Sequence, residues 1–92
     1  MPHVVYILRC ADDSLYVGYT FDLELRMVHH NEGRGSRFTA LRRPVELIHT
    51  ERHETLASAL ERERQLKHWT RAKKLALVNG MNRHWHDLYE EL

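Results

Sequence analysis

The segment VVYILRC at residues 4–10, followed by LYVGYT at residues 15–20, decides the fold of this chain. Both segments consist mainly of β-branched, aromatic and aliphatic residues, which favour extended strands. Between them lies ADDS, a run of residues that favour turns. We therefore expect the two segments to pair as an antiparallel hairpin.

The length of the hairpin connection decides which side chains share a face of the sheet. A connection of odd length, residues 11–13, sets Tyr6 opposite Gly18 and puts Tyr6 and Tyr16 on one face. A connection of even length, residues 11–14, puts the two tyrosines on opposite faces. The sequence leaves both registers open.

The order of the remaining elements predicts an α+β fold. A hairpin, a helix, a third strand and two further helices give the order ββα-β-αα, typical of a small three-stranded, mostly antiparallel sheet flanked by helices. The helices begin after the N-capping residues Asp22, Thr55 and Thr70, and Gly80 ends the last one. The expected ranges are 23–31, 56–68 and 71–79 for the helices and 45–50 for the strand.

Composition limits the class of protein. A chain of 92 residues is expected to form one domain, comprising residues 1–80, with 81–92 packed on it or fraying from it. It has neither the roughly 18 consecutive apolar residues of a membrane span nor the pattern of a signal peptide. Its single cysteine suits a reducing compartment. We therefore expect a cytoplasmic protein.

Two segments concentrate positive charge in a chain whose formal net charge is only +1. RGSRFTALRR at 34–43 has four arginines and no acidic residue, and RERQLKHWTRAKK at 62–74 has six lysines and arginines against one glutamate. A localised basic face is typical of proteins that bind phosphate backbones, although solvated helix faces give the same composition. The candidate nucleic-acid-binding residues are Arg34, Arg37, Arg42, Lys67, Lys73 and Lys74.

Glu63 interrupts an apolar stripe in the helix expected at 56–68. A carboxylate on an inward face is costly unless it is paired or bound to a metal. A partly buried ion pair with Arg26 or Lys67 is one interpretation, and a metal ligand is the other. The stripe consists of Leu56, Ala59, Leu60 and Leu66.

The helix expected at 23–31 has a similar anomaly. Arg26 and His30 lie one turn apart on the face that they share with Leu23 and Met27. An arginine in this position can present its planar guanidinium to a phosphate, or it can form a structural ion pair.

These residues together resemble the GIY-YIG nuclease superfamily. VVY at 4–6 and YVG at 16–18 are similar to the paired tripeptides that name it. Arg26 and His30, in LELRMVHHN, fit the helix pattern of that superfamily, and Glu63, in ALERERQLK, fits its metal-binding glutamate.

The resemblance covers about residues 3–80 and is greatest to small standalone bacterial members, in which stretches like HNEGRGSRFT and RRPVEL recur. Two positions differ from the pattern. Val4 stands where the family name has glycine, and the region about a dozen residues after Glu63 reads AKKL at 72–75, where many members have an asparagine.

The resemblance implies an endonuclease that hydrolyses phosphodiester bonds, in DNA rather than RNA, with one Mg²⁺ or Mn²⁺ ion. Tyr6 or Tyr16 would accept a proton from the attacking water, and Arg26 would favour the phenolate and bind the scissile phosphate. Glu63 would hold the metal. His30 would be a hydrogen-bonding partner or an auxiliary acid or base.

Gly18 would keep the strand surface clear for the substrate.

Two other functions fit the same residues. A nucleic-acid-binding module could keep a degenerate, weakly active site, and its affinity would fall steeply with salt. A protein-interaction domain would bind no nucleic acid even at low salt.

Overall fold

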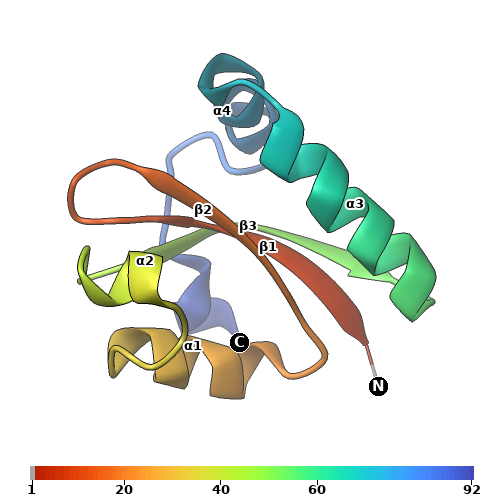
Figure 1. Ribbon diagram of the computed structural model, residues 1–92. Coiled ribbons are helices and arrows are strands. Elements are labelled where there is room, and N and C mark those ends of the chain that lie inside the picture. The colour runs from red at the N-terminus through yellow and green to blue at the C-terminus, as the bar shows by residue number, and fades with distance from the viewer. Residues whose placement is uncertain (1) are drawn as a thin grey trace.

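Strand β1 forms the centre of a three-stranded antiparallel sheet, with β2 along one edge and β3 along the other. In this computed structural model, which describes residues 2–92, helices cover both faces of the sheet (Figure 1). This architecture confirms the expected α+β class. In chain order the elements are β1 (His3–Arg9), β2 (Leu15–Thr20), α1 (Leu23–Asn31), α2 (Arg37–Ala40), β3 (Glu46–His53), α3 (Leu56–His68), α4 (Arg71–Met81) and the 3₁₀ helix η1 (Leu88–Glu91).

The hairpin has the odd register. The backbone N–H of Cys10 donates to the carbonyl of Ser14 at 2.9 Å, and Tyr6 lies opposite Gly18. Tyr6 and Tyr16 consequently point to the same face. Asp13 takes a left-handed conformation with φ of 67° in the turn, which aspartate tolerates better than most residues.

The alternation of side chains along β1 builds two cores (Figure 1). α3 and α4 cover the face that carries Val5 and Ile7, while α1, α2 and η1 lie on the opposite side, which carries Tyr6 and Leu8. The first core also contains Val17, Ile48, Ala59, Leu66 and Val78, and the second contains Cys10, Met27, Val45 and Leu47.

The three predicted N-caps are confirmed. Asp22, Thr55 and Thr70 each accept a hydrogen bond from a backbone N–H three residues later. The predicted end of the last helix is wrong, because α4 continues through Gly80 to Met81. A glycine inside a helix costs only about 1 kcal/mol, and the buried side chain of Asn82, whose Nδ2 donates to the Ile48 carbonyl at 3.2 Å, fixes the helix end on the sheet.

Two other predictions need correction, and one element was missed. Leu56 and Leu60 are 47% and 43% exposed, because α3 rests on the sheet mainly through Ala59 and Leu66. The third strand runs to His53, beyond the expected residue 50, because it continues to pair with β1 as far as His3. The short helix α2 was not predicted. It begins after Ser36, whose side chain accepts a hydrogen bond from the Thr39 backbone N–H.

The segment after α4 crosses from the α3–α4 side of the sheet to the α1 side (Figure 1). Asp87 accepts a hydrogen bond from the Leu47 backbone N–H at 3.1 Å, and Leu88 and Tyr89 pack against the second core. Within residues 2–92, no helix has the length and apolar character that crossing a membrane requires.

Candidate functional site

Tyr6 lies at the centre of a cluster of predicted site residues. Its side chain is fully buried over Gly18, where any Cβ atom would overlap the phenol ring. The space over Gly18 is therefore filled by Tyr6. The Tyr6 hydroxyl lies 2.8 Å from Nε2 of His30 and accepts a hydrogen bond from Nε of Arg26 at 3.3 Å.

On the side away from Tyr6, His30 is held by the loop that precedes α2 and by α2 itself. Its side chain is fully buried, and its Nδ1 lies 2.9 Å from Oγ1 of Thr39, which is also fully buried. A Cβ atom at Gly35 would overlap the imidazole ring, so the backbone of this loop lies directly against it. The sequence HNEGRGSRFT thus folds back over its own histidine.

Burial gives the Tyr6–His30 pair no net charge near neutral pH. Burial raises the pKa of Tyr6 to about 12, against the lowering effect of the Arg26 hydrogen bond. Burial also lowers the pKa of His30 to about 4, helped by the positive charges of Arg26 and His29. The phenol is therefore protonated and the imidazole neutral at pH 7.

Arg26 supplies the positive charge of this cluster. Its guanidinium is half-buried, and the hydrogen bond to Tyr6, together with smaller effects of Tyr16, holds its pKa above the usual value. Arg26 also lines a surface pocket beside the cluster, so it can reach a bound anion. The pocket is lined by Thr20, Phe21, Asp22, Leu25, Arg26 and His29.

Tyr16 is the more accessible tyrosine of the pair. Its ring centroid lies 6.4 Å from that of Tyr6 and 5.3 Å from that of His30. The ring also stacks on Phe38 of α2 at 6.1 Å, with an interplanar angle of 25°. Tyr16 and Phe38 line a second surface pocket, together with Leu15, Val17, Lys67 and Lys74.

Glu63 comes from α3, on the opposite side of the sheet from α1 (Figure 1). Its side chain is 20% exposed, and Oε2 lies 3.4 Å from Nζ of Lys67. The predicted ion pair with Lys67 is therefore present. The negative charge of Glu63 is also among the effects that raise the pKa of Tyr6, after burial and the charge of Tyr16. Glu63 thus acts electrostatically on the tyrosine cluster.

The donor set around Glu63 fits a hydrated hard cation. No group of three His, Cys, Asp or Glu side chains within the described part of the chain could hold a metal ion. Zinc, which needs three or four protein ligands, therefore does not fit. Mg²⁺ keeps several of its waters and can be bound through a single carboxylate and substrate phosphates, so Glu63 fits this ion and Mn²⁺.

The candidate basic residues divide by position. Lys67 and Lys74 lie in the pocket of Tyr16, whereas Lys73 lies over the Trp69 ring at 4.3 Å. Arg42 lies 3.9 Å over the Phe38 ring and pairs with Asp12 at 3.2 Å. Arg34 pairs with Glu32, and Arg37 is exposed on α2.

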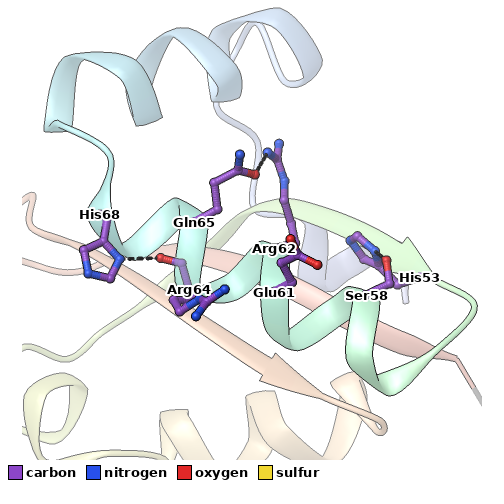
Figure 2. A pocket seen from close by; sticks show the side chains of 7 residues that line it. All are labelled: His53, Ser58, Glu61, Arg62, Arg64, Gln65 and His68. Carbon is purple, nitrogen blue, oxygen red and sulfur yellow. Dashed lines mark hydrogen bonds between the residues drawn. The ribbon is translucent and has the colours of Figure 1, made fainter.

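Another hollow lies on the outer side of α3 and extends to His53 at the end of β3 (Figure 2). Its most buried arginine, Arg62, holds the carboxylate of Glu51 with two hydrogen bonds of 2.8 and 3.0 Å. Arg62 also donates to Gln65 (Figure 2). None of the predicted catalytic residues lines this hollow, whose lining residues are His53, Ser58, Glu61, Arg62, Arg64, Gln65 and His68.

Comparison with known proteins gives the class of this chain. Residues 2–76 match the GIY-YIG catalytic domain, and the chain belongs to this family. The predicted resemblance is confirmed. The superfamily consists of endonucleases, which generally use divalent metal ions, so the domain implies a nucleic-acid substrate.

The chain is similar to the proteins called UPF0213. It is 49% identical over 76 residues to the UPF0213 protein of Staphylococcus aureus strain Mu3, covering 83% of this chain and 93% of that protein. The solution structure of the UPF0213 protein BH0048 from Bacillus halodurans matches with 37% identity and a TM-score of 0.64, over 95% of this chain and 93% of that chain. The protein EF2693 from E. faecalis matches with 38% identity and a TM-score of 0.62, over 94% and 92%.

Three residues of the cluster were not predicted as site residues. The Thr39 hydroxyl lies beside Nδ1 of His30, and the Ser36 hydroxyl lies beside that of Thr39. Phe38 stacks on Tyr16. The stretch that contains them stands out in the sequence for its arginines and for its likeness to small bacterial members of the superfamily. The Ser36-Arg37-Phe38-Thr39 spacing, with an N-cap residue three positions before Thr39, was the available signal for a helix start.

Proposed function

We propose that this protein is an endonuclease that hydrolyses phosphodiester bonds of nucleic acid, DNA in preference to RNA, with one Mg²⁺ or Mn²⁺ ion. The observation that supports this most is the convergence of Tyr6, Tyr16, Arg26 and His30 on one face of the sheet. Glu63, whose charge acts on Tyr6, completes the set in a member of the GIY-YIG family.

Arg26 binds the scissile phosphate in this proposal. Its Nε is occupied by the Tyr6 hydroxyl, which fixes the plane of the guanidinium. The two Nη groups of the guanidinium then donate hydrogen bonds to the phosphate oxygens and stabilise the negative charge that develops on them.

The two tyrosines have different roles. Tyr6 is enclosed and holds its proton, with a pKa of about 12, so it positions Arg26 and His30. Tyr16 is half-buried and lines an open pocket, so it is the tyrosine that can meet an attacking water and accept its proton. The positive charge of Arg26, whose pKa is raised in part by Tyr16, acts on the same tyrosine.

Glu63 is the metal ligand in this proposal. The ion, when bound, stabilises the charge on the phosphate oxygens and on the leaving group. The ion pair with Lys67 restrains the carboxylate, whose charge acts on Tyr6.

Lys67 and Lys74 bind backbone phosphates next to the scissile bond, because they line the pocket that contains Tyr16. Phe38 stacks on Tyr16 and is covered by Arg42, so it supports the wall of this pocket. Arg34, Arg37 and Arg42 extend the basic surface along the neighbouring loop and α2. Lys74 lies in the region where many family members have an asparagine, and it supplies a phosphate contact there.

Cleavage of a panel of nucleic acids tests this function. Wild type, Arg26→Ala and the control Arg64→Ala, whose arginine lines the outer hollow of α3, are incubated with single-stranded, duplex and branched DNA and with matched RNA. We expect cleavage by wild type and by Arg64→Ala in Mg²⁺ or Mn²⁺, none in chelator, and a loss of at least about 100-fold in Arg26→Ala. Equal cleavage by all three proteins would show contamination and overturn the proposal.

The same panel distinguishes the alternatives. Binding of nucleic acid that weakens with salt, without cleavage in either metal, would indicate the binding module. Absence of binding at low salt would indicate the protein-interaction domain.

A further inference from the structure

A chain of hydrogen bonds leads from Arg26 to the N-terminus of α2. Nε of Arg26 lies 3.3 Å from the Tyr6 hydroxyl, which lies 2.8 Å from Nε2 of His30. Nδ1 of His30 lies 2.9 Å from Oγ1 of Thr39, which in turn lies 2.8 Å from Oγ of Ser36. Tyr6, His30 and Thr39 are fully buried, so water does not complete their hydrogen bonds from outside.

The direction of each hydrogen bond follows from the need to pair buried polar groups. Arginine can only donate, so the Tyr6 oxygen accepts from Arg26. Among the described residues, the Tyr6 hydroxyl has two hydrogen-bond partners, Arg26 and His30. Arg26 cannot accept, so the Tyr6 hydroxyl donates its hydrogen bond to Nε2 of His30. His30 is neutral, so its proton is on Nδ1 and is donated to Thr39.

Thr39 can accept the hydrogen bond from Nδ1–H of His30, because the Thr39 hydroxyl can donate its own hydrogen bond to Ser36. Oγ1 of Thr39 lies 3.4 Å from the Ser36 carbonyl, which can only accept, and 2.8 Å from the Ser36 hydroxyl. The backbone N–H of Thr39 donates to the same Ser36 hydroxyl at 3.0 Å. Ser36 therefore orients Thr39 through the cap of α2.

The opposite direction leaves a buried donor without a partner. If Thr39 donated to Nδ1, His30 would carry its proton on Nε2 and would donate to the Tyr6 oxygen. That oxygen would then receive two donors, His30 and Arg26, while the Tyr6 proton would have no acceptor. An unpaired buried hydroxyl costs about 1–3 kcal/mol, so the first direction is favoured.

We propose that Thr39 is a positioning residue that, together with Tyr6, stabilises the Nδ1-protonated tautomer of His30 and thereby fixes the orientation of Arg26. The tautomer part of this inference stands on the geometry alone, and its consequence for turnover rests on the proposed endonuclease function. Loss of the Thr39 acceptor lets the His30 proton move to Nε2. His30 then competes with Arg26 for the Tyr6 oxygen and releases the guanidinium from its fixed plane.

The tautomer of His30 is measured directly by ¹⁵N NMR of the imidazole in wild type, Thr39→Val and Thr39→Ser. The nearly isosteric valine removes the hydroxyl, and serine keeps it. We expect protonated Nδ1 in wild type and Thr39→Ser, and a shift of the proton towards Nε2 in Thr39→Val. An Nε2-protonated wild type would overturn the proposal even if the valine variant failed to fold, and so would a folded valine variant with an unchanged tautomer.

Kinetics test the consequence for Arg26. We expect Thr39→Val to lower kcat about tenfold with little change in KM, and Thr39→Ser to restore it. A valine variant that shifts the tautomer but keeps the wild-type kcat would overturn the link to Arg26. If wild type cleaves no nucleic acid, the proposed function fails, whereas the NMR result still decides the role of Thr39.

Discussion

The Tyr6 hydroxyl lies 2.8 Å from Nε2 of His30, although 24 residues separate the two in the sequence. The pKa of Tyr6 is about 12 and that of His30 about 4, so neither side chain is charged over most of the pH range in which proteins are handled. The positive charge of the cluster therefore belongs to Arg26, and this neutral pair holds it in position.

Tyr6 and Tyr16 should respond differently to removal of the hydroxyl. Tyr6→Phe leaves Nε of Arg26 and the buried Nε2 of His30 without a partner, so we expect the free energy of unfolding to fall by about 1–3 kcal/mol and cleavage to be lost. Tyr16→Phe should change stability by less than about 0.5 kcal/mol and abolish cleavage. Urea unfolding and cleavage rates measure the two effects. Equal stability losses would contradict the different roles of the tyrosines.

Two glycines provide a matched pair for stability. Gly18→Ala should destabilise the protein by about 3 kcal/mol, because its methyl group would overlap the Tyr6 ring. Gly80→Ala should stabilise it by about 0.5–1 kcal/mol, because the position is helical and open. Urea unfolding compares the variants, and a tolerated Gly18→Ala would show that Tyr6 does not occupy the space over the glycine.

The stability of the protein should fall as the pH drops below 6.5. The pKa of His30 falls from 6.5 to about 4 on folding, so between these values the unfolded chain binds more protons than the folded one. The stabilisation is complete above pH 6.5, and up to about 3 kcal/mol is lost as the pH falls through 4.

His30→Gln should flatten the dependence of unfolding free energy on pH between 4.5 and 6.5, whereas the exposed His84→Gln should keep it. Glu51 does not interfere in this interval. Burial alone would raise its pKa, but hydrogen bonds from His49 and Arg62 lower it to about 2, so its contribution is lost only below 4.5. An unchanged slope in His30→Gln would contradict a buried neutral His30.

Lys67 and Lys74 should govern the salt dependence of nucleic-acid binding. Each phosphate contact removed should lower the slope of log affinity against log salt by about one, so Lys67→Ala and Lys74→Ala should each have this effect. Arg52→Ala is the control, because Arg52 is exposed on β3, at the sheet edge opposite to β2. The slope is measured by fluorescence anisotropy. An unchanged slope in both lysine variants would show that bound nucleic acid does not pass through the Tyr16 pocket.

Local rules predicted most of the secondary structure. The N-caps Asp22, Thr55 and Thr70 fixed the starts of three helices, because capping depends on residues within one turn. The end of α4 was not predictable in this way. The helix continues through Gly80 because the Asn82 side chain binds the carbonyl of Ile48, a contact between residues far apart in the sequence.

The sequence predicted the proposed catalytic residues of the candidate site, but neither their contacts nor the supporting residues of α2. Helical spacing marked Arg26, His30 and Glu63 as polar residues on apolar faces, and the paired tripeptides gave the family. The partner of each side chain depends on the hairpin register, which sequence left open, and on α2, whose short length gives almost no periodic signal. Thr39 therefore could be recognised only once its hydroxyl was seen beside His30.

Cleavage by Glu63→Gln is the most direct test of a metal-assisted nuclease site. The substitution removes the carboxylate charge and keeps the size of the side chain, and Glu61→Gln is its control on the outer side of the same helix. We predict that Glu63→Gln lowers the Mg²⁺- or Mn²⁺-dependent cleavage rate at least about 100-fold, while Glu61→Gln cleaves at the wild-type rate. Wild-type rates in both variants would contradict a metal-assisted nuclease site at Glu63.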